Sequence, residues 1–139
     1  MHGSSAESLA RLTDRVVAAG EGGADGAELG PGLFGASAVL TTQPGLRRAL
    51  TDPSTEAGAR KGLAEAVFGQ HVSDAASTVV SEAAALRWVA SADLADALEQ
   101  LGVLAIVRAA AREGAADRVE EETFRFGRHG TGKHARCRQ

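Results

Sequence analysis

The sequence contains few aromatic residues: four Phe and one Trp among 139 residues, and no Tyr. Its apolar residues are mostly Ala, Leu and Val, and because Ala and Leu lose little entropy in a helix, this composition favours helices over sheets. The single cysteine, Cys137, excludes a disulfide framework. No stretch of about 18 apolar residues occurs, so no membrane-spanning helix is predicted. Residues 1–12 also lack the basic and apolar regions of a secretory signal, which agrees with a cytoplasmic location.

The charges are distributed unevenly along the chain. Residues 1–124 hold ten Lys/Arg and all eighteen Asp/Glu, which gives a net charge of −8, whereas residues 125–139 hold five Lys/Arg and no acid. Affinity for nucleic acid rests on neutralising phosphates, and an acidic domain is poorly suited to that task. We therefore expect no nucleic-acid partner for the main part of the chain.

The spacing of apolar residues predicts helices and no convincing strand. In the first helix Leu9, Leu12 and Val16 fall on one stripe, and Ser4 or Ser5 can cap it. A glycine-rich break is expected over 20–32, and Pro31 near its end could be the first residue of the second helix. The sequence thus predicts an all-α bundle. The expected helices cover 4–19, 31–43, 44–51, about 55–68, about 74–89, 92–101 and about 103–126.

Two glycine motifs resemble nucleotide-binding loops. Residues 30–35 (GPGLFG) match the dinucleotide fingerprint, but a glycine-rich segment rather than a strand precedes them, so a linker and helix start is the favoured interpretation. Residues 127–133 (GRHGTGK) match most of a P-loop, yet His134 replaces the Ser/Thr that would hold magnesium. No strand leads into that segment, so neither motif predicts phosphate binding.

No metal site or catalytic centre is expected, and no cofactor. His129, His134 and Cys137 offer only three ligands near the chain end, whereas a structural zinc site needs four. The Ser and Thr residues stand mostly at helix starts, where capping explains them, and the acid run over 120–122 is typical of a solvated helix face. What remains is a helical module of the kind that holds another protein's helix in a groove.

Three stretches of sequence, taken together, resemble one protein family. They are residues 44–53 (PGLRRALTDP), residues 86–101 with LRW at the start and DLADALEQL at the end, and residues 119–128 (VEEETFRFGR). In this order and spacing the chain, from residue 1 to about 128, resembles the delta subunit of F-type ATP synthases in its actinobacterial form.

The resemblance implies a fold, a role and a set of partners. It implies a six-helix bundle over 1–102, followed by a helix over 103–128 and a basic disordered tail over 129–139. The role is that of a non-catalytic stator subunit, peripheral on the cytoplasmic face of the cell membrane, which contacts the membrane only through the complex. The partners are the N-terminal helices of the alpha subunits, held between the first and fifth helices, and the b subunit of the stalk. The groove residues expected on this basis are Leu9, Leu12, Val16, Val79, Val80 and Ala83.

The sequence departs from the family at its end. The family continues into a C-terminal domain that meets the b subunit, whereas here the likeness stops after Arg128 and the composition changes abruptly. The interpretation at this point is a truncation or frameshift, with a defective link to the b subunit. The alternative function is a generic helical adaptor that binds protein or RNA, with the basic tail making the contact.

Overall fold

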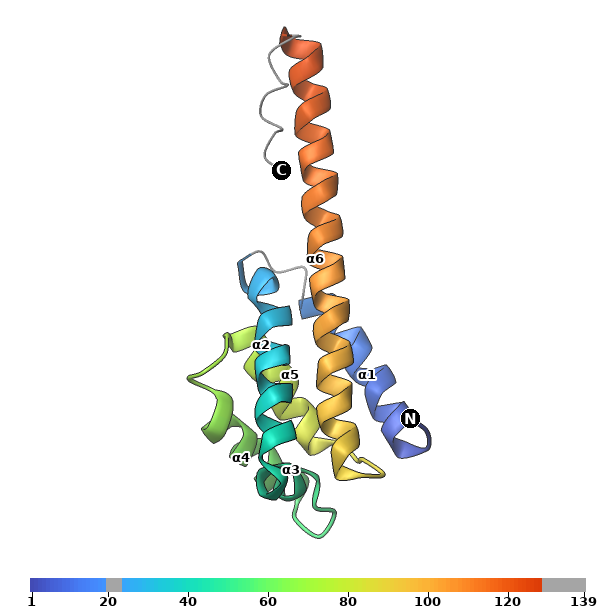
Figure 1. The fold of residues 1–139 in the computed structure, drawn as a ribbon, viewed down its shortest axis with the longest axis vertical. Coiled ribbons are helices and arrows are strands. Elements are labelled where there is room, and N and C mark those ends of the chain that lie inside the picture. Colours follow the sequence, from blue (N-terminus) through green and yellow to red (C-terminus); the bar gives the residue numbers. More distant parts are fainter. Residues whose placement is uncertain (20–23, 129–139) are drawn as a thin grey trace. The chain divides into compact units, whose positions relative to one another are not determined.

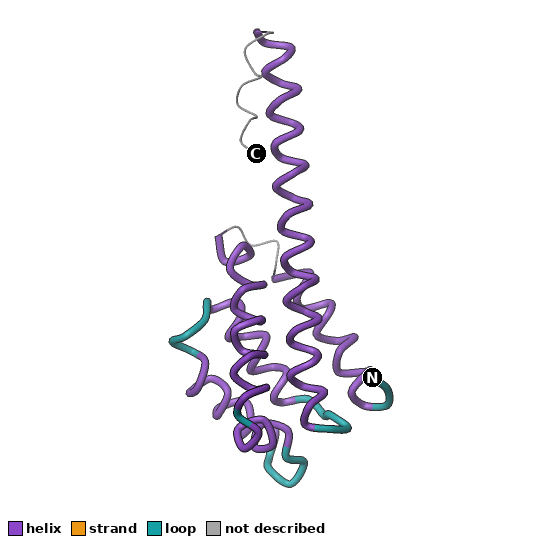
Figure 2. Tube along the Cα trace, in the orientation of Figure 1, coloured by secondary structure: helices purple, strands orange, loops and turns teal. Residues whose placement is uncertain are grey.

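The computed structural model describes the backbone of residues 1–19 and 24–128, and the side chains of residues 1–19 and 27–114. This part of the chain contains six α-helices and no strand, which confirms the all-α fold class (Figure 2). The tail expected over 129–139 lies outside the described residues. The helices are α1 (Ser4–Ala19), α2 (Ala24–Thr42), α3 (Pro44–Thr51), α4 (Ala57–Phe68), α5 (Asp74–Ala85) and α6 (Ser91–Arg128).

The chain divides into two compact units, Met1–Val107 and Arg108–Gln139. In the second unit the described backbone, residues 108–128, is the later part of α6. In the first unit, α5 is the central helix, because it contacts α1, α2, α3 and α4 (Figure 1). The packing of the first unit is therefore organised around α5.

The core of the first unit is built from Ala, Leu and Val. Five apolar residues of α5 are almost completely buried, and fully buried Leu side chains from the other helices surround them. Each Leu or Val buried in this way contributes roughly 1.5–3 kcal/mol relative to an exposed position. The small α5 residues let the neighbouring helices approach closely. The buried α5 residues are Ser81 and the apolar Ala76, Val79, Val80, Ala83 and Ala84.

Helix α2 begins before Pro31, so the expected linker is wrong for residues 24–32, while residues 20–23 lie outside the described part. The glycines here serve packing. A Cβ on Gly32 would stand 2.6 Å from the Cβ of Ala76, and one on Gly30 would stand 2.4 Å from Ile106 Cγ1. Leu29, which precedes Pro31, is fully buried. Its burial offsets much of the roughly 3 kcal/mol that a proline costs inside a helix.

The two separate helices expected on either side of residue 102 form one continuous helix, α6. Gly102 looks like a helix stop in the sequence, but it is buried inside α6, where a Cβ would lie 3.3 Å from the carbonyl oxygen of Gly30. Figure 1 shows α2 beside the first part of α6 at this level. Close approach of the two backbones thus explains Gly102, which lies within the first unit.

Helices α4 and α5 also end or begin at residues that differ from expectation. Ser54 and Thr55 do not cap α4, because both hydroxyl groups donate to the Asp52 carboxylate, and α4 begins after Glu56. Helix α5 is capped as expected by Ser73, which accepts a hydrogen bond from the Ala76 N–H at 3.2 Å. It ends at Ala85 instead of near Val89.

Two glycines of α2 give a matched pair of alanine variants. A Cβ added at Gly35 would have no atom within 4 Å, whereas a Cβ added at Gly32 would face the Ala76 Cβ. Gly35→Ala should raise the free energy of unfolding by about 1 kcal/mol, because alanine is the better helix former. Gly32→Ala should lower it by roughly 1–3 kcal/mol through overpacking. Urea denaturation of both variants measures these changes, and shifts of the same sign would contradict the packing described for α2.

Asp52 makes the turn between α3 and α4 sensitive to acid. The hydroxyl and the backbone N–H of Ser54 both donate to its carboxylate, at 2.7 and 2.9 Å, and these bonds lower the pKa of Asp52 below its ordinary value of 3.8. A lowered folded-state pKa contributes stability above the unfolded-state pKa, and this contribution is lost as the pH falls through the folded value. The free energy of unfolding should therefore fall less steeply for Asp52→Asn than for the wild type between about pH 5 and pH 2. Equal slopes would contradict this role.

Candidate docking groove

A cavity of about 390 Å³ lies among α1, α4 and the end of α5. Its lining combines an apolar floor with charged side chains. Leu12 is almost completely buried, and Ala85 and Leu86 are half-buried. The lining residues are Arg11, Leu12, Arg15, Lys61, Glu82, Ala85 and Leu86.

One ion pair joins the two helices that border the groove. The Arg15 guanidinium of α1 contacts the Glu82 carboxylate of α5 through two hydrogen bonds, Nε to Oε1 at 2.6 Å and Nη2 to Oε2 at 2.7 Å. The side chains are 52% and 30% exposed, so the pair faces solvent. Within the described part of the chain, neither Arg11 nor Lys61 forms an ion pair. The groove therefore carries an excess of positive charge.

Two serines of α1 fix this helix against the segment that follows α5. The Ser5 hydroxyl accepts a hydrogen bond from the Val89 N–H at 2.7 Å and donates one to Asp93 Oδ2 at 2.7 Å. The Ser8 hydroxyl donates to the Arg87 carbonyl at 2.7 Å. Both serines are buried, so these bonds satisfy hydroxyl groups that would otherwise be costly to remove from water. They hold α1 in register beside α5.

The end of α5 is set by buried side chains from elsewhere. Arg60 of α4 is only 6% exposed, and all five of its N–H groups donate to main-chain carbonyls. Trp88 Nε1 donates to the Ala83 carbonyl at 2.8 Å. The carbonyl groups in the last turn of a helix have no N–H partner within the helix. The bonds from Arg60 and Trp88 supply partners for these carbonyls at the end of α5, so the chain can turn at Leu86. The acceptors for Arg60 are the carbonyls of Asp52, Thr55, Ala84, Ala85 and Leu86.

A second cavity, of about 320 Å³, lies on the other side of Leu86 and is lined in part by Arg60 and Trp88. The guanidinium of Arg60 in this lining would suggest an anion-binding site. Because every N–H group of Arg60 already donates to a carbonyl, no donor is left for a phosphate or carboxylate. Arg60 thus acts on the groove indirectly, by placing Ala85 and Leu86.

The structure places the six residues expected to contact a partner mostly inside the core. Five of them are at most 1% exposed, and Leu9 is half-buried against the core. Leu12 is the one that also lines the cavity. That these residues meet a partner stays a prediction. The five buried residues are Leu12, Val16, Val79, Val80 and Ala83.

Sequence reasoning missed the charged border of the groove. Arg11 and Arg15 stand four residues apart on the same side of the Leu12 stripe, and Glu82 occupies the solvent side of α5. Side chains four apart lie on one face of a helix, so the Arg11–Arg15 spacing was a usable signal. Lys61 carried no such signal, because only the packing of α4 on α5 brings it to the groove.

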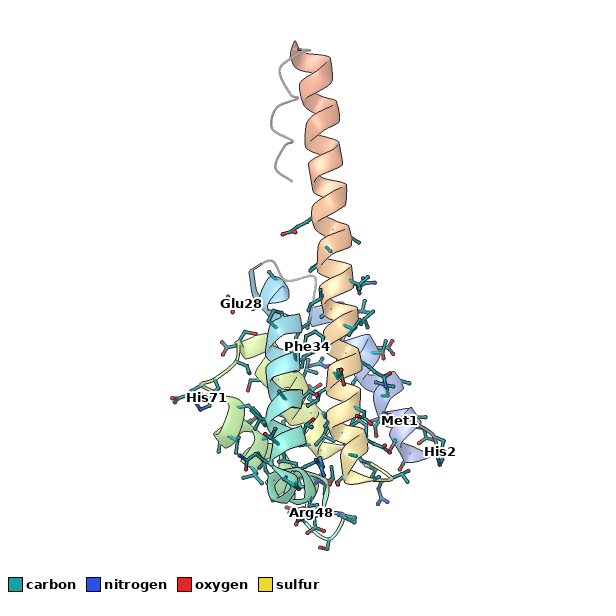
Figure 3. The ribbon with its side chains drawn as sticks, viewed as in Figure 1. Met1, His2, Glu28, Phe34, Arg48 and His71 are labelled. Carbon is teal, nitrogen blue, oxygen red and sulfur yellow. The ribbon has the colours of Figure 1, made fainter. Side chains whose placement is uncertain are left out.

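The motifs that suggested other chemistry have ordinary places in the fold. Gly30, Gly32 and Gly35 lie within α2, with no strand before them in the described residues. His2 and His71 lie on opposite sides of the first unit (Figure 3). The described residues contain no cluster of three potential metal ligands. The ligand trio and most of the P-loop-like segment, in 129–139, lie outside the described residues.

Among the described helices, none has both the length and the apolar character that crossing a bilayer requires. The fold and the groove together define a class: an all-α bundle with an apolar-floored groove between two helices. No family model matches the chain. Individual proteins, in contrast, match most of the chain.

The chain is similar to ATP synthase delta subunits from several bacteria. It is 43% identical over 132 residues to the one from Acidothermus cellulolyticus, with 92% of the chain and 48% of that protein covered. It is 41% identical over 129 residues to the one from Streptomyces coelicolor (92% and 47% covered) and 44% identical over 112 residues to the one from Rhodococcus opacus (81% and 40% covered).

The resemblance to ATP synthase delta subunits is therefore confirmed, and the chain spans about half the length of these relatives. The delta subunit is a non-catalytic subunit of its complex. This agrees with the expectation from the sequence that the chain is not an enzyme.

Arg60→Lys tests the clamp at the end of α5. A lysine ammonium has three donors at one point and cannot reproduce the fork of the guanidinium, so at least two carbonyls lose their partner. The free energy of unfolding should fall by roughly 2–4 kcal/mol. Arg48→Lys, on an exposed position of α3, is the matched control and should change stability by less than about 0.5 kcal/mol. Similar stabilities of the two variants in urea would refute the clamp.

Proposed function

We propose that this protein is a stator subunit, part of the peripheral stalk, of an F-type proton-translocating ATP synthase. Its first unit holds an N-terminal helix of an alpha subunit in the groove between α1 and α5 and so attaches to the catalytic head. The observation that carries the proposal is the apolar-floored groove at α1 and α5 in a chain that matches delta subunits over 92% of its length.

The six residues expected from the sequence have two roles in this proposal. Leu12 forms part of the floor, where an apolar stripe of the bound helix packs. Leu9 is partly buried against the core. Val16, Val79, Val80 and Ala83 lie beneath, where they hold α1 against α5 and keep the groove in shape. Burial of a helix's apolar stripe in such a groove is a common mode of peptide recognition.

The proposed role is mechanical. A stator holds the catalytic head still against the torque of the rotor, so its contacts need strength and rigidity rather than reactive groups. Binding to the head and to the b subunit of the stalk at once would supply that strength, because linked contacts raise the effective affinity of each. The subunit acts at the cytoplasmic face of the cell membrane and is held there by the complex.

The adaptor alternative rests on the basic residues over 125–139, whose side chains lie outside the described part of the chain. No observation in the first unit favours RNA, because its net charge is negative. The two functions differ in their response to salt. Binding to an apolar groove persists at moderate salt, whereas binding driven by phosphates falls steeply.

Filling the groove should abolish docking without unfolding the bundle. Ala85 is half-buried in the groove, so Ala85→Phe would occupy the space of a ligand side chain. Titration calorimetry with a synthetic alpha-subunit N-terminal helix should give one-to-one binding to the wild type and at least about tenfold weaker binding to Ala85→Phe, since a blocked anchor costs about 1.4 kcal/mol or more.

The control for this titration is Ala49→Phe, an equal increase in size on the exposed surface of α3. It should bind the peptide like the wild type. Helical circular dichroism and urea denaturation verify that both variants are folded. If the folded wild type binds no alpha-subunit helix, or if the two variants bind it equally well, the proposed docking function is wrong.

A further inference from the structure

The groove gathers positive charge from a unit that is otherwise acidic. Residues 1–107 contain seven Lys/Arg and thirteen Asp/Glu. Three of these seven cations, Arg11, Arg15 and Lys61, line this one cavity, against a single acid, Glu82. They come from two helices, α1 and α4, so the packing of the bundle, and not one basic stretch of sequence, brings them together.

The contacts within the groove leave its charge incompletely balanced. Glu82 is engaged by Arg15 through both carboxylate oxygens. Arg11 and Lys61 make no ion pair with another described residue, and both are exposed. Between these cations the floor is apolar, formed by Leu12, Ala85 and Leu86. A ligand complementary to this surface must present apolar and negatively charged groups side by side.

We propose that the groove selects an amphipathic helix whose apolar stripe is bordered by Asp or Glu side chains, which pair with Arg11 and Lys61. This inference rests on the proposed docking function for the kind of ligand, and it adds the chemistry by which the ligand is chosen. The apolar stripe supplies most of the affinity, and the bordering carboxylates set the orientation and exclude helices with basic borders.

Glu82 has a defined part in this selection. It lies in the groove and repels a carboxylate of the ligand, and the bidentate contact with Arg15 offsets this repulsion. Replacing Glu82 by Gln removes the negative charge and leaves Arg15 available to the ligand. Affinity for an acid-bordered helix should therefore increase when Glu82 is neutralised, although an interhelical ion pair of the protein is lost.

The test uses three synthetic peptides that share one apolar helical stripe and differ only in the bordering residues: Glu, Gln or Lys. Titrations at about 0.15 M salt, where the Debye length is about 8 Å, screen the distant acids of the unit but not the groove cations. The wild type should bind the Glu peptide roughly two- to tenfold more tightly than the Gln peptide, because two partly exposed ion pairs form. The Lys peptide should bind most weakly.

Charge-reversal variants assign the preference to the groove. Arg11→Glu and Lys61→Glu should each remove most of the preference for the Glu peptide while changing Gln-peptide binding little, and Glu82→Gln should enlarge it. Arg48→Glu, an equal change of charge on α3, is the control and should leave the preference unchanged (Figure 3).

The outcomes separate this inference from the docking function. Equal binding of the Glu and Gln peptides, or tighter binding of the Lys peptide, would overturn the charge selection and leave groove docking intact. An equal effect of Arg48→Glu and Lys61→Glu would overturn it as well, because the preference would then come from net charge. If none of the three peptides binds the folded wild type, the docking function and the inference fail together.

Discussion

The groove depends on one buried guanidinium. Arg60 lies in the interior of the first unit and donates all five of its N–H groups to carbonyls, three of them at the end of α5. Burial of an unsatisfied charge would cost several kcal/mol, so this complete set of acceptors is what makes the position tolerable. The same contacts end α5 at Ala85 and turn Leu86 outward beside α1. The geometry of the groove at that turn is therefore set by Arg60.

Close backbone packing is the second constraint, and it uses glycine inside helices. Gly32 lets α2 approach α5, and Gly30 with Gly102 lets α2 approach α6. An isolated helix would be weakened by each of these residues, since glycine costs up to about 1 kcal/mol relative to alanine. Here the loss is offset by burial of neighbouring Leu side chains such as Leu29 and Leu33. The glycines thus lower the intrinsic stability of the individual helices but allow these helices to pack more closely.

The sequence predicted the elements whose signals are local. The bounds of α1 and the all-α class follow from apolar spacing within a few positions, and the start of α5 follows from the Ser73 cap. The start of α2, the continuity of α6 and the end of α5 did not follow, because contacts with residues far along the chain decide them. The groove was predicted between the first and fifth helices, but periodicity identifies only the faces that pack together. It therefore named buried residues such as Val79, and it missed Lys61, which tertiary packing alone brings to the groove.

The bonds of Ser5 and Ser8 have a consequence for how the bundle folds. Their partners lie 79 to 88 residues further along the chain, beyond α5 and at the start of α6. During synthesis α1 is made first, and the hydroxyl groups of Ser5 and Ser8 can form their buried hydrogen bonds only after that later segment has been made. Contacts of such long range slow folding and make it cooperative. Helix α1, which borders the groove, is therefore the first to be made and is expected to be among the last to be fixed, so the groove forms only when the rest of the first unit has packed.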